Sequence, residues 1–199
     1  DLPYRRLADA VEEAYAAGLF GRNILGSDFA CDIVVYRGAG AYVAGEASGL
    51  ISSLEGKKGY PRNRPPRLTV RGLYQRPTVV NNVESLSNIA WIISNGADAF
   101  KAVGTPKSPG TRLFSVSGHI NRPGVYEVEL GYPWMKFLDE DCGGVPHGRA
   151  IKCVVPGGVS SKVLTGADIA DLKLSHEDLW DAGSTLGSGG MIVIAEGTC

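Results

Sequence analysis

Residues 32–54 contain the sequence pattern that most restricts the fold of this chain. The segment 32–37 (Asp-Ile-Val-Val-Tyr-Arg) is rich in β-branched side chains and lies between Gly26 and Gly38, which predicts a buried strand. Gly-Ala-Gly follows at 38–40, and the aliphatic residues of 50–54 then share one helical face. A strand, a glycine turn and a helix in this order form the unit of an α/β domain.

Two further helices and a long loop complete the first half of the chain. Apolar side chains recur at helical spacing over 4–19, and a helix is predicted over about 83–94. Asn81 occupies the expected N-cap of that helix, with a glutamate three residues later, and Gly96 supplies its stop. Residues 56–77 are rich in glycine and proline, and loops of this length are usually functional or disordered.

The pattern changes at the Pro/Gly-rich segment 104–110 and becomes rich in strands beyond it. Two β-branched segments flank an Asn-Arg-Pro-Gly turn, which predicts a hairpin, and a short helix and two more strands follow. The chain is therefore expected to hold part of an α/β domain at 1–106 and a small α+β domain of the β-grasp kind at 107–199. The predicted elements of the second domain are strands at 113–117 and 125–128, a helix around 135–141, and strands at 150–155 and 191–195.

Composition and charge exclude several classes of function. The chain is 44% hydrophobic and 21% charged, which is ordinary for a soluble globular protein, and its net charge of −1 gives no reason to expect nucleic acid as a partner. No apolar run reaches the roughly 18 residues of a membrane span, so no direct membrane insertion is expected. The N-terminal residues lack the apolar core of a secretory signal, and the missing initiator methionine indicates an internal fragment of a longer protein.

The cysteines and histidines form no recognisable metal or catalytic pattern. The four cysteines include no C-x-x-C pair, so the zinc and ferredoxin spacings are missing. Buried or incidental thiols in a reducing compartment are favoured, which indicates a cytoplasmic protein. The three histidines are scattered and no nucleophile elbow is present, so neither a metal site nor Ser-His-Asp catalysis is expected.

The glycine turn is the first candidate binding site. Backbone N–H groups and the dipole of the following helix favour an anion at such a position. Val43 stands where the dinucleotide fingerprint needs its third glycine, so that fingerprint is incomplete. A tight strand-to-helix turn without a ligand is an equally good interpretation of the pattern alone.

The basic loop, residues 56–77, is the second candidate. It holds seven basic residues and no acid, so it could steer a phosphorylated ligand, although a solvated loop face is the favoured interpretation of the charges alone. After the loop, the amides of Asn81 and Asn82 could bind a planar polar ring or a phosphate, or could cap the following helix. The seven basic residues are Lys57, Lys58, Arg62, Arg64, Arg67, Arg71 and Arg76.

Four motifs, in this order and spacing, carry a resemblance to a known family. Residues 38–46 (Gly-Ala-Gly-Ala-Tyr-Val-Ala-Gly-Glu) resemble G-A-G-A-Y-x-x-G-E-E, and residues 77–84 resemble P-T-x-x-N-N-V-E-T. Residues 53–59 and 61–66 are similar to what lies between these two motifs, and residues 121–127 and 155–158 resemble the β-grasp segment of that family. The family is the NADH-binding flavoprotein subunit of respiratory complex I. Related flavin subunits of NAD-reducing hydrogenases and NAD-dependent formate dehydrogenases share the motifs.

The resemblance implies a Rossmann-like FMN-binding domain followed by a soluble-ligand-binding, ubiquitin-like β-grasp domain. In the full subunit NADH gives a hydride to FMN, and electrons leave through iron–sulfur clusters. Tyr42, Gly45 and Glu46 would line the flavin and nicotinamide side, and Asn81 and Asn82 would contact the flavin. No side chain here is expected to act as an acid, base or nucleophile.

The resemblance also implies cofactors, partners and a location. The cofactors of the full subunit would be FMN, NAD(H) and a 4Fe-4S cluster whose ligands lie outside this chain. Its partners would be NADH and the other subunits of a complex I-like assembly, especially a 2Fe-2S thioredoxin-like subunit. It would lie in the cytoplasm, peripheral to the inner membrane through the parent complex.

Two substitutions depart from the family pattern and leave a second interpretation open. Ala47 replaces the second glutamate, and Arg67 replaces an aromatic residue that helps to hold NADH. The family's upstream G-R-G-G-A-G-F-P loop and downstream C-x-x-C-x-x-C motif are not in the sequence. The alternative is a non-catalytic paralogue, acting as a binding or assembly module through its β-grasp domain.

Overall fold

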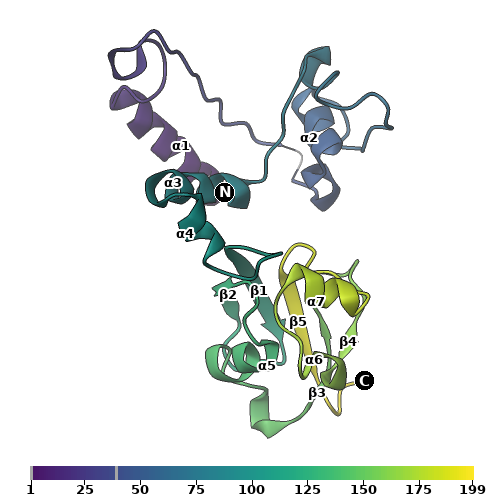
Figure 1. Cartoon of the computed structure of the whole chain (residues 1–199). Helices are drawn as coiled ribbons and strands as arrows, with labels where there is room; N and C mark the ends of the chain where they lie inside the picture. The colour runs from purple at the N-terminus through teal and green to yellow at the C-terminus, as the bar shows by residue number, and fades with distance from the viewer. Residues whose placement is uncertain (1, 39) are drawn as a thin grey trace. The chain divides into compact units, whose positions relative to one another are not determined.

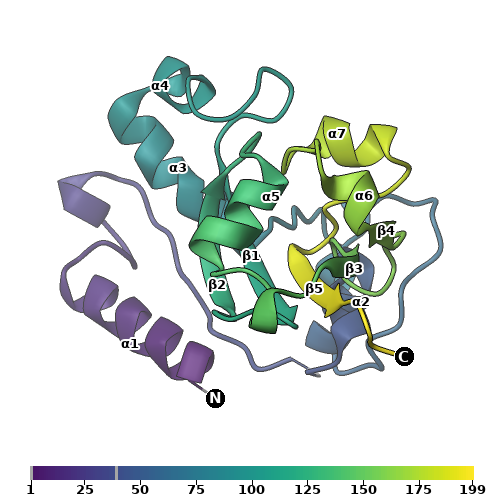
Figure 2. The same ribbon diagram turned by 90° about the horizontal axis from the view of Figure 1, so that it is seen from below.

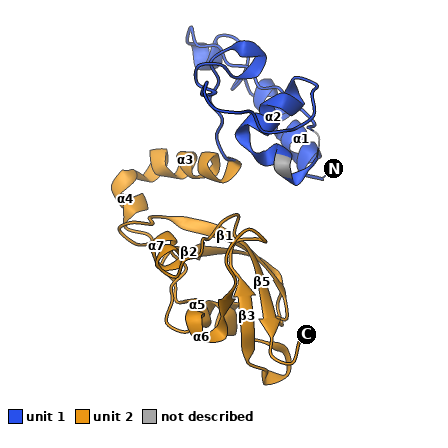
Figure 3. Cartoon of the chain, turned by 90° about the vertical axis from the view of Figure 1, so that its right-hand side faces the viewer, with its two compact units in different colours: residues 1–82 blue, residues 83–199 orange. Residues whose placement is uncertain are grey.

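A computed structural model of the chain describes residues 2–38 and 40–199, and at Val43 the backbone alone. Ala39 of the predicted glycine turn therefore lies outside the described residues. The chain divides into two compact units, 1–82 and 83–199, which are described separately below (Figure 3). Residues 83–106 belong to the second compact unit, and the domain boundary at 106/107 stays a prediction.

The first unit is built from helices and loops. Two predicted helices are confirmed, α1 at Leu2–Ala16 and α2 at Ala47–Leu54, and short 3-10 turns lie at Ile24–Gly26, Tyr42–Gly45 and Leu73–Gln75. Helix α1 buries none of its residues, whereas α2 buries Ile51 almost completely. The small core of this unit therefore gathers around α2.

The predicted strand at 32–37 is wrong. This segment has no ladder partner among the described residues, and Val34 is 84% exposed. It is held instead by α1, because the Tyr15 hydroxyl accepts from the Ile33 N–H at 3.0 Å and donates to Asp32 at 2.9 Å. The β-branched composition favours an extended backbone, but a strand also needs neighbours for its hydrogen bonds, and residues 2–38 and 40–82 supply none.

The second unit contains the sheet. Its helices and strands include every element predicted for residues 111–199 (Figure 1). Three short α-helices, a 3-10 turn at Pro146–Gly148 and a two-residue strand were not predicted. The helices are α3 Val83–Asn95, α4 Ala97–Lys101, α5 Trp134–Lys136 with a π-helical turn at Phe137–Asp141, α6 Gly166–Ile169 and α7 His176–Asp181. The strands are β1 Thr111–Gly118, β2 Gly124–Glu129, β3 Ile151–Val155, β4 Leu164–Thr165 and β5 Gly190–Ala195.

The described residues form one open five-stranded sheet in the order β2-β1-β5-β3-β4. Strands β1 and β2 pair as the predicted antiparallel hairpin, and β1 and β5 pair in parallel at the centre. Alternate residues of β1, Phe114 and Val116, point into the core, where they join Trp134, Phe137 and Leu179 from the helices. Helices α5, α6 and α7 gather on this face of the sheet (Figures 1 and 2). The chain is thus a mixed α/β protein.

The start of α3 differs by one residue from the prediction. The helix begins at Val83, so the N-cap position falls on Asn82 rather than Asn81. The carboxylate of Glu84 accepts a hydrogen bond from the Leu113 N–H at 2.9 Å and so ties the first turn of α3 to β1. The predicted stop is confirmed, because the helix ends at Asn95 and Gly96 has a positive φ of 88°.

The loop 104–110, predicted as a domain boundary, is fastened to the second unit by carboxylates. The Ser108 hydroxyl donates to Glu177 at 2.5 Å, and the Thr105 hydroxyl donates to the other carboxylate oxygen. The Gly104 N–H donates to Glu129 at 2.9 Å. The hydrogen bonds from Ser108 and Thr105 lower the pKa of Glu177 to about 2.

We expect the hydrogen bonds between Glu177 and the loop 104–110 to weaken in acid. The folded pKa of Glu177 lies below its ordinary value of about 4.3, so its stabilisation is complete above that value and is lost as the pH falls toward about 2. Urea unfolding should show Glu177→Gln as less stable than the parent at pH 7, with the difference shrinking between about pH 4.3 and about pH 2. Glu140→Gln is the control, because Glu140 is 67% exposed and lies 3.9 Å from Lys136. A difference that stays constant with pH would contradict the assignment.

Candidate functional site

The glycine turn is followed by the 3-10 turn Tyr42–Gly45 and then by α2, and Glu46 caps that helix. The Glu46 carboxylate accepts from the backbone N–H of Ser48 at 2.9 Å and of Gly49 at 3.1 Å, and from the Ser48 hydroxyl. An acidic side chain is stabilised here by the free N–H groups and the dipole of the helix. The anion position at the start of α2 is therefore filled by the chain's own carboxylate.

The electrostatics of Glu46 follow from these contacts. The hydrogen bond from the Ser48 hydroxyl lowers the pKa of Glu46, and the N–H groups and Arg64 act in the same direction. The Arg64 guanidinium lies 3.3 Å from the carboxylate, and the Glu46 side chain is 40% exposed. Glu46 is thus an ionised group that a ligand could reach while it caps the helix.

A cavity of about 170 Å³ lies beside the turn and is lined by its glycines. A side chain added at Gly40 or Gly45 would meet nothing within 4 Å, so the backbone there is open to a ligand. Tyr42 is 87% exposed on the short 3-10 turn that also holds Gly45. Tyr42 and Gly45 therefore lie on one accessible 3-10 turn, and Glu46 follows it as the N-cap of α2.

The basic loop folds back on α2, and Glu55 pairs with two of its cations. Arg62 and Lys57 each lie 2.8 Å from the Glu55 carboxylate, which is only 5% exposed. The hydrogen bond from Lys57, with those from Arg62 and the Tyr74 N–H, lowers the pKa of Glu55 to about 2. Arg62 Nε also donates to the Ser52 hydroxyl at 3.1 Å. The sequence signal for this pairing is an acid at each end of α2, Glu46 and Glu55, ahead of an acid-free basic loop.

The same fold gathers basic side chains around one cavity. Lys57, Arg62, Arg64 and Arg71 line a space of about 240 Å³ together with Ser48. A concave site with several cations attracts phosphate groups and other anions. Lys57 and Arg62 pair with Glu55, and Arg64 pairs with Glu46, so a phosphorylated ligand at the basic loop stays a prediction.

Asn81 and Asn82 lie at the end of the first unit, on the segment that follows the basic loop. Both are exposed, and Asn82 occupies the N-cap position of α3. Their predicted contact with a flavin stays a prediction.

Metal ligands, reactive thiols and membrane-spanning helices are the other features that could carry a function in the described residues. Among residues 2–38 and 40–199 no three His, Cys, Asp or Glu side chains lie close enough together to hold a metal ion. Cys31, Cys142, Cys153 and Cys199 are free thiols, and burial raises the pKa of Cys142 to about 11, which makes it unreactive. No helix in the described part of the chain is long and apolar enough to cross a bilayer.

Known proteins match both the sequence and the fold. Residues 3–91 match the family model described as the Nuo51 FMN-binding domain. The F subunit of the NADH-quinone oxidoreductase of Mycobacterium tuberculosis is 49% identical over 195 residues, which cover 98% of this chain and 43% of that protein. The F subunit of the Streptomyces coelicolor enzyme is 47% identical, with the same coverage. The second F subunit of the Rhizobium meliloti enzyme is 42% identical over 98% of this chain and 46% of that protein.

A solved structure supports the same relationship. An NAD+-reducing NiFe hydrogenase in the air-oxidized state has a TM-score of 0.69 and 38% identity, covering 79% of this chain and 26% of that chain. The chain spans less than half the length of the curated relatives named above. Residues 3–91 are thus homologous to an FMN-binding domain. More particularly, the chain is a homologue of the F subunit of NADH-quinone oxidoreductase, and the resemblance inferred from the motifs is confirmed.

Proposed function

We propose that this chain is part of a subunit that oxidises NADH by hydride transfer to FMN and passes the electrons to iron–sulfur clusters. The observation that carries the proposal is the position of the FMN-binding match, residues 3–91. That match covers the open glycine turn, the capped start of α2 and the cavity of the basic loop. It supports the catalytic interpretation over the assembly-module alternative.

The residues present fit a flavin nucleotide. The open backbone at Gly40 and Gly45 admits a flat ligand, and the basic cavity suits phosphate groups. When bound, FMN supplies the chemistry by accepting a hydride and releasing electrons one at a time. Tyr42, Gly45 and Glu46 would line its nicotinamide side. Glu46 would accept hydrogen bonds from the nicotinamide or its ribose, held in place by the start of α2 and Arg64.

We propose, further, that Asn81 and Asn82 contact the flavin, and that the first unit is part of a Rossmann-like domain. The second unit fits the β-grasp kind, because a hairpin, crossing helices and a parallel pairing of its first and last strands give the order β2-β1-β5-β3-β4. The curated relatives are named as F subunits, which supports a multi-subunit assembly. A 2Fe-2S thioredoxin-like subunit and a peripheral position on the inner membrane are the proposed partner and location.

A chimera tests this function. The segment of the M. tuberculosis F subunit that aligns with this chain would be replaced by these 199 residues. We expect the chimera to retain stoichiometric FMN through gel filtration and to reduce ferricyanide with NADH. A folded chimera that retains no flavin would contradict the proposal.

The isolated chain is expected to bind FMN weakly, with a dissociation constant well above micromolar. Glu46 already occupies the N–H groups at the start of α2, so these groups are not available to the phosphate. Titration followed by flavin fluorescence checks this, with riboflavin as the control that lacks the phosphate. Stoichiometric FMN retained by the isolated chain would show that it holds a complete site.

A further inference from the structure

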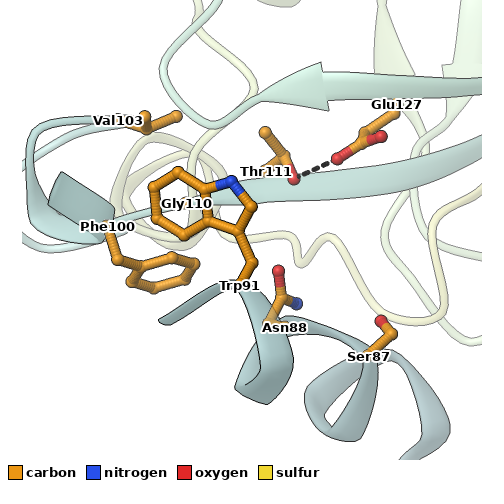
Figure 4. A pocket seen from close by; sticks show the side chains of 8 residues that line it. All are labelled: Ser87, Asn88, Trp91, Phe100, Val103, Gly110, Thr111 and Glu127. Carbon is orange, nitrogen blue, oxygen red and sulfur yellow. Dashed lines mark hydrogen bonds between the residues drawn. The ribbon is translucent and has the colours of Figure 1, made fainter. Parts of the chain in front are cut away.

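A cavity of about 360 Å³ opens within the second unit (Figure 4). It lies where α3 and α4 meet the start of β1 and the end of β2. Asn88 and Trp91 come from α3, Phe100 from α4, Thr111 from β1 and Glu127 from β2. None of the roles proposed above involves this cavity.

Two aromatic rings form adjoining walls of the cavity. The centroids of Trp91 and Phe100 lie 6.2 Å apart and their planes are tilted by 58°. The Phe100 ring occupies the space over Gly110, where an added Cβ would come within 2.4 Å of it. Gly110 also has a positive φ of 90°, which other residues rarely adopt. Both the backbone conformation and the contact with the Phe100 ring therefore require glycine here. Trp91 remains 44% exposed, which leaves ring surface accessible to a ligand.

The opposite wall carries a fixed negative charge. The Thr111 hydroxyl donates to Glu127 at 2.6 Å and orients its carboxylate (Figure 4). A smaller adjoining cavity of about 130 Å³ shares Thr111 and Glu127 and adds Glu84. Arg112 also lines the smaller cavity, but its guanidinium donates to the Gly187 carbonyl. In the part of the chain that the structure describes, no ion pair joins Glu127 to a cation.

We infer that this cavity binds a guanidinium group, presented as an arginine side chain by a partner subunit. A cation is attracted to the faces of Trp and Phe, and a guanidinium stacks on such rings while it forms paired hydrogen bonds with a carboxylate. The volume of the cavity exceeds what a lone guanidinium fills, so it also admits the stem of the side chain and flanking backbone. The acidic and aromatic lining is complementary to arginine in both charge and shape.

Titration of the 199-residue chain with the peptide acetyl-Gly-Arg-Gly-amide, followed by tryptophan fluorescence, tests the site. We expect saturable binding with a dissociation constant on the order of 1 mM. The citrulline peptide, which is neutral and of the same shape, should not saturate. Methylguanidine should bind more weakly than the arginine peptide, because it lacks the stem and backbone. Equal affinity for methylguanidine would overturn the assignment to a partner's side chain in favour of a small free cation.

Matched variants show which residues bind the arginine peptide. Glu127→Gln keeps the shape of the wall and should weaken the peptide at least about fivefold. Glu140→Gln removes an exposed charge from the same unit without lining the cavity, and should leave the affinity unchanged. Trp91→Leu should abolish most of the fluorescence change. Equal weakening by the two glutamine variants, or binding of the citrulline peptide, would overturn the inference.

Discussion

Glu46→Ala is expected to weaken NADH use by roughly 10- to 150-fold in the chimeric full-length subunit. Removal of one charged hydrogen-bond partner of a ligand typically costs about 1.5–3 kcal/mol. Alanine also removes the cap of α2, which accepts from Ser48 and Gly49, at a further cost of about 0.5–2 kcal/mol in stability. Steady-state NADH–ferricyanide kinetics and thermal unfolding measure the two effects separately.

Two companion variants separate the capping role of Glu46 from its role in binding. Glu46→Gln retains an acceptor oxygen for the helix N–H groups but loses the charge beside Arg64, so it should keep stability while NADH use falls. Ala47→Glu adds a negative charge to the first turn of α2, where such a charge is favourable. If the alanine reflects lost function, the added acid should raise NADH activity. Unchanged kinetics in Glu46→Ala would show that the site is wrongly placed.

Phe114→Ala is expected to lower the free energy of unfolding of the second unit by about 3–5 kcal/mol. The Phe114 side chain is fully buried on β1, and its ring centroid lies 6.0 Å from that of Phe137. Its loss leaves a cavity in the centre of the core, which the sheet and helices can fill only in part. Urea unfolding followed by circular dichroism provides the measurement.

Leu113→Ala is the matched control for Phe114→Ala. Leu113 is the preceding residue of β1, points to the opposite face of the sheet and is 48% exposed. Its replacement should cost less than about 1 kcal/mol. Similar losses in the two variants would mean that the alternation of buried and exposed residues along β1 is misassigned.

Local sequence patterns predicted those elements whose own residues show a clear helical or alternating pattern. Helices α1, α2 and α3 have several apolar residues at helical spacing, and the β1–β2 hairpin has a clear turn between alternating segments. Helices α4, α6 and α7 were missed because they have five, four and six residues, too few for a periodic signal. The strand at 32–37 was predicted wrongly because composition describes an extended backbone but not the partner it needs.

The candidate site stays a prediction, and the sequence indicated that its residues lie close together only where one short motif holds them. Tyr42, Gly45 and Glu46 are near neighbours in sequence, on a 3-10 turn and the N-cap position that follows it. The pairing of Arg62 with Glu55 depends on how the basic loop folds back on α2, which residue spacing does not specify. The cavity between Trp91 and Glu127 was missed for the same reason, since helix packing against the hairpin creates it.

The parallel pairing at the centre of the sheet also constrains when the second unit can fold during synthesis. Strand β1 contacts β2 directly after it in the chain, but its other neighbour is β5, the last strand of the sheet. The hairpin can form as soon as residue 129 leaves the ribosome, whereas the core face of β1 cannot be enclosed until residues 190–195 have been translated. Phe114 and Val116 thus remain accessible to chaperones, or to aggregation, throughout translation of the intervening segment.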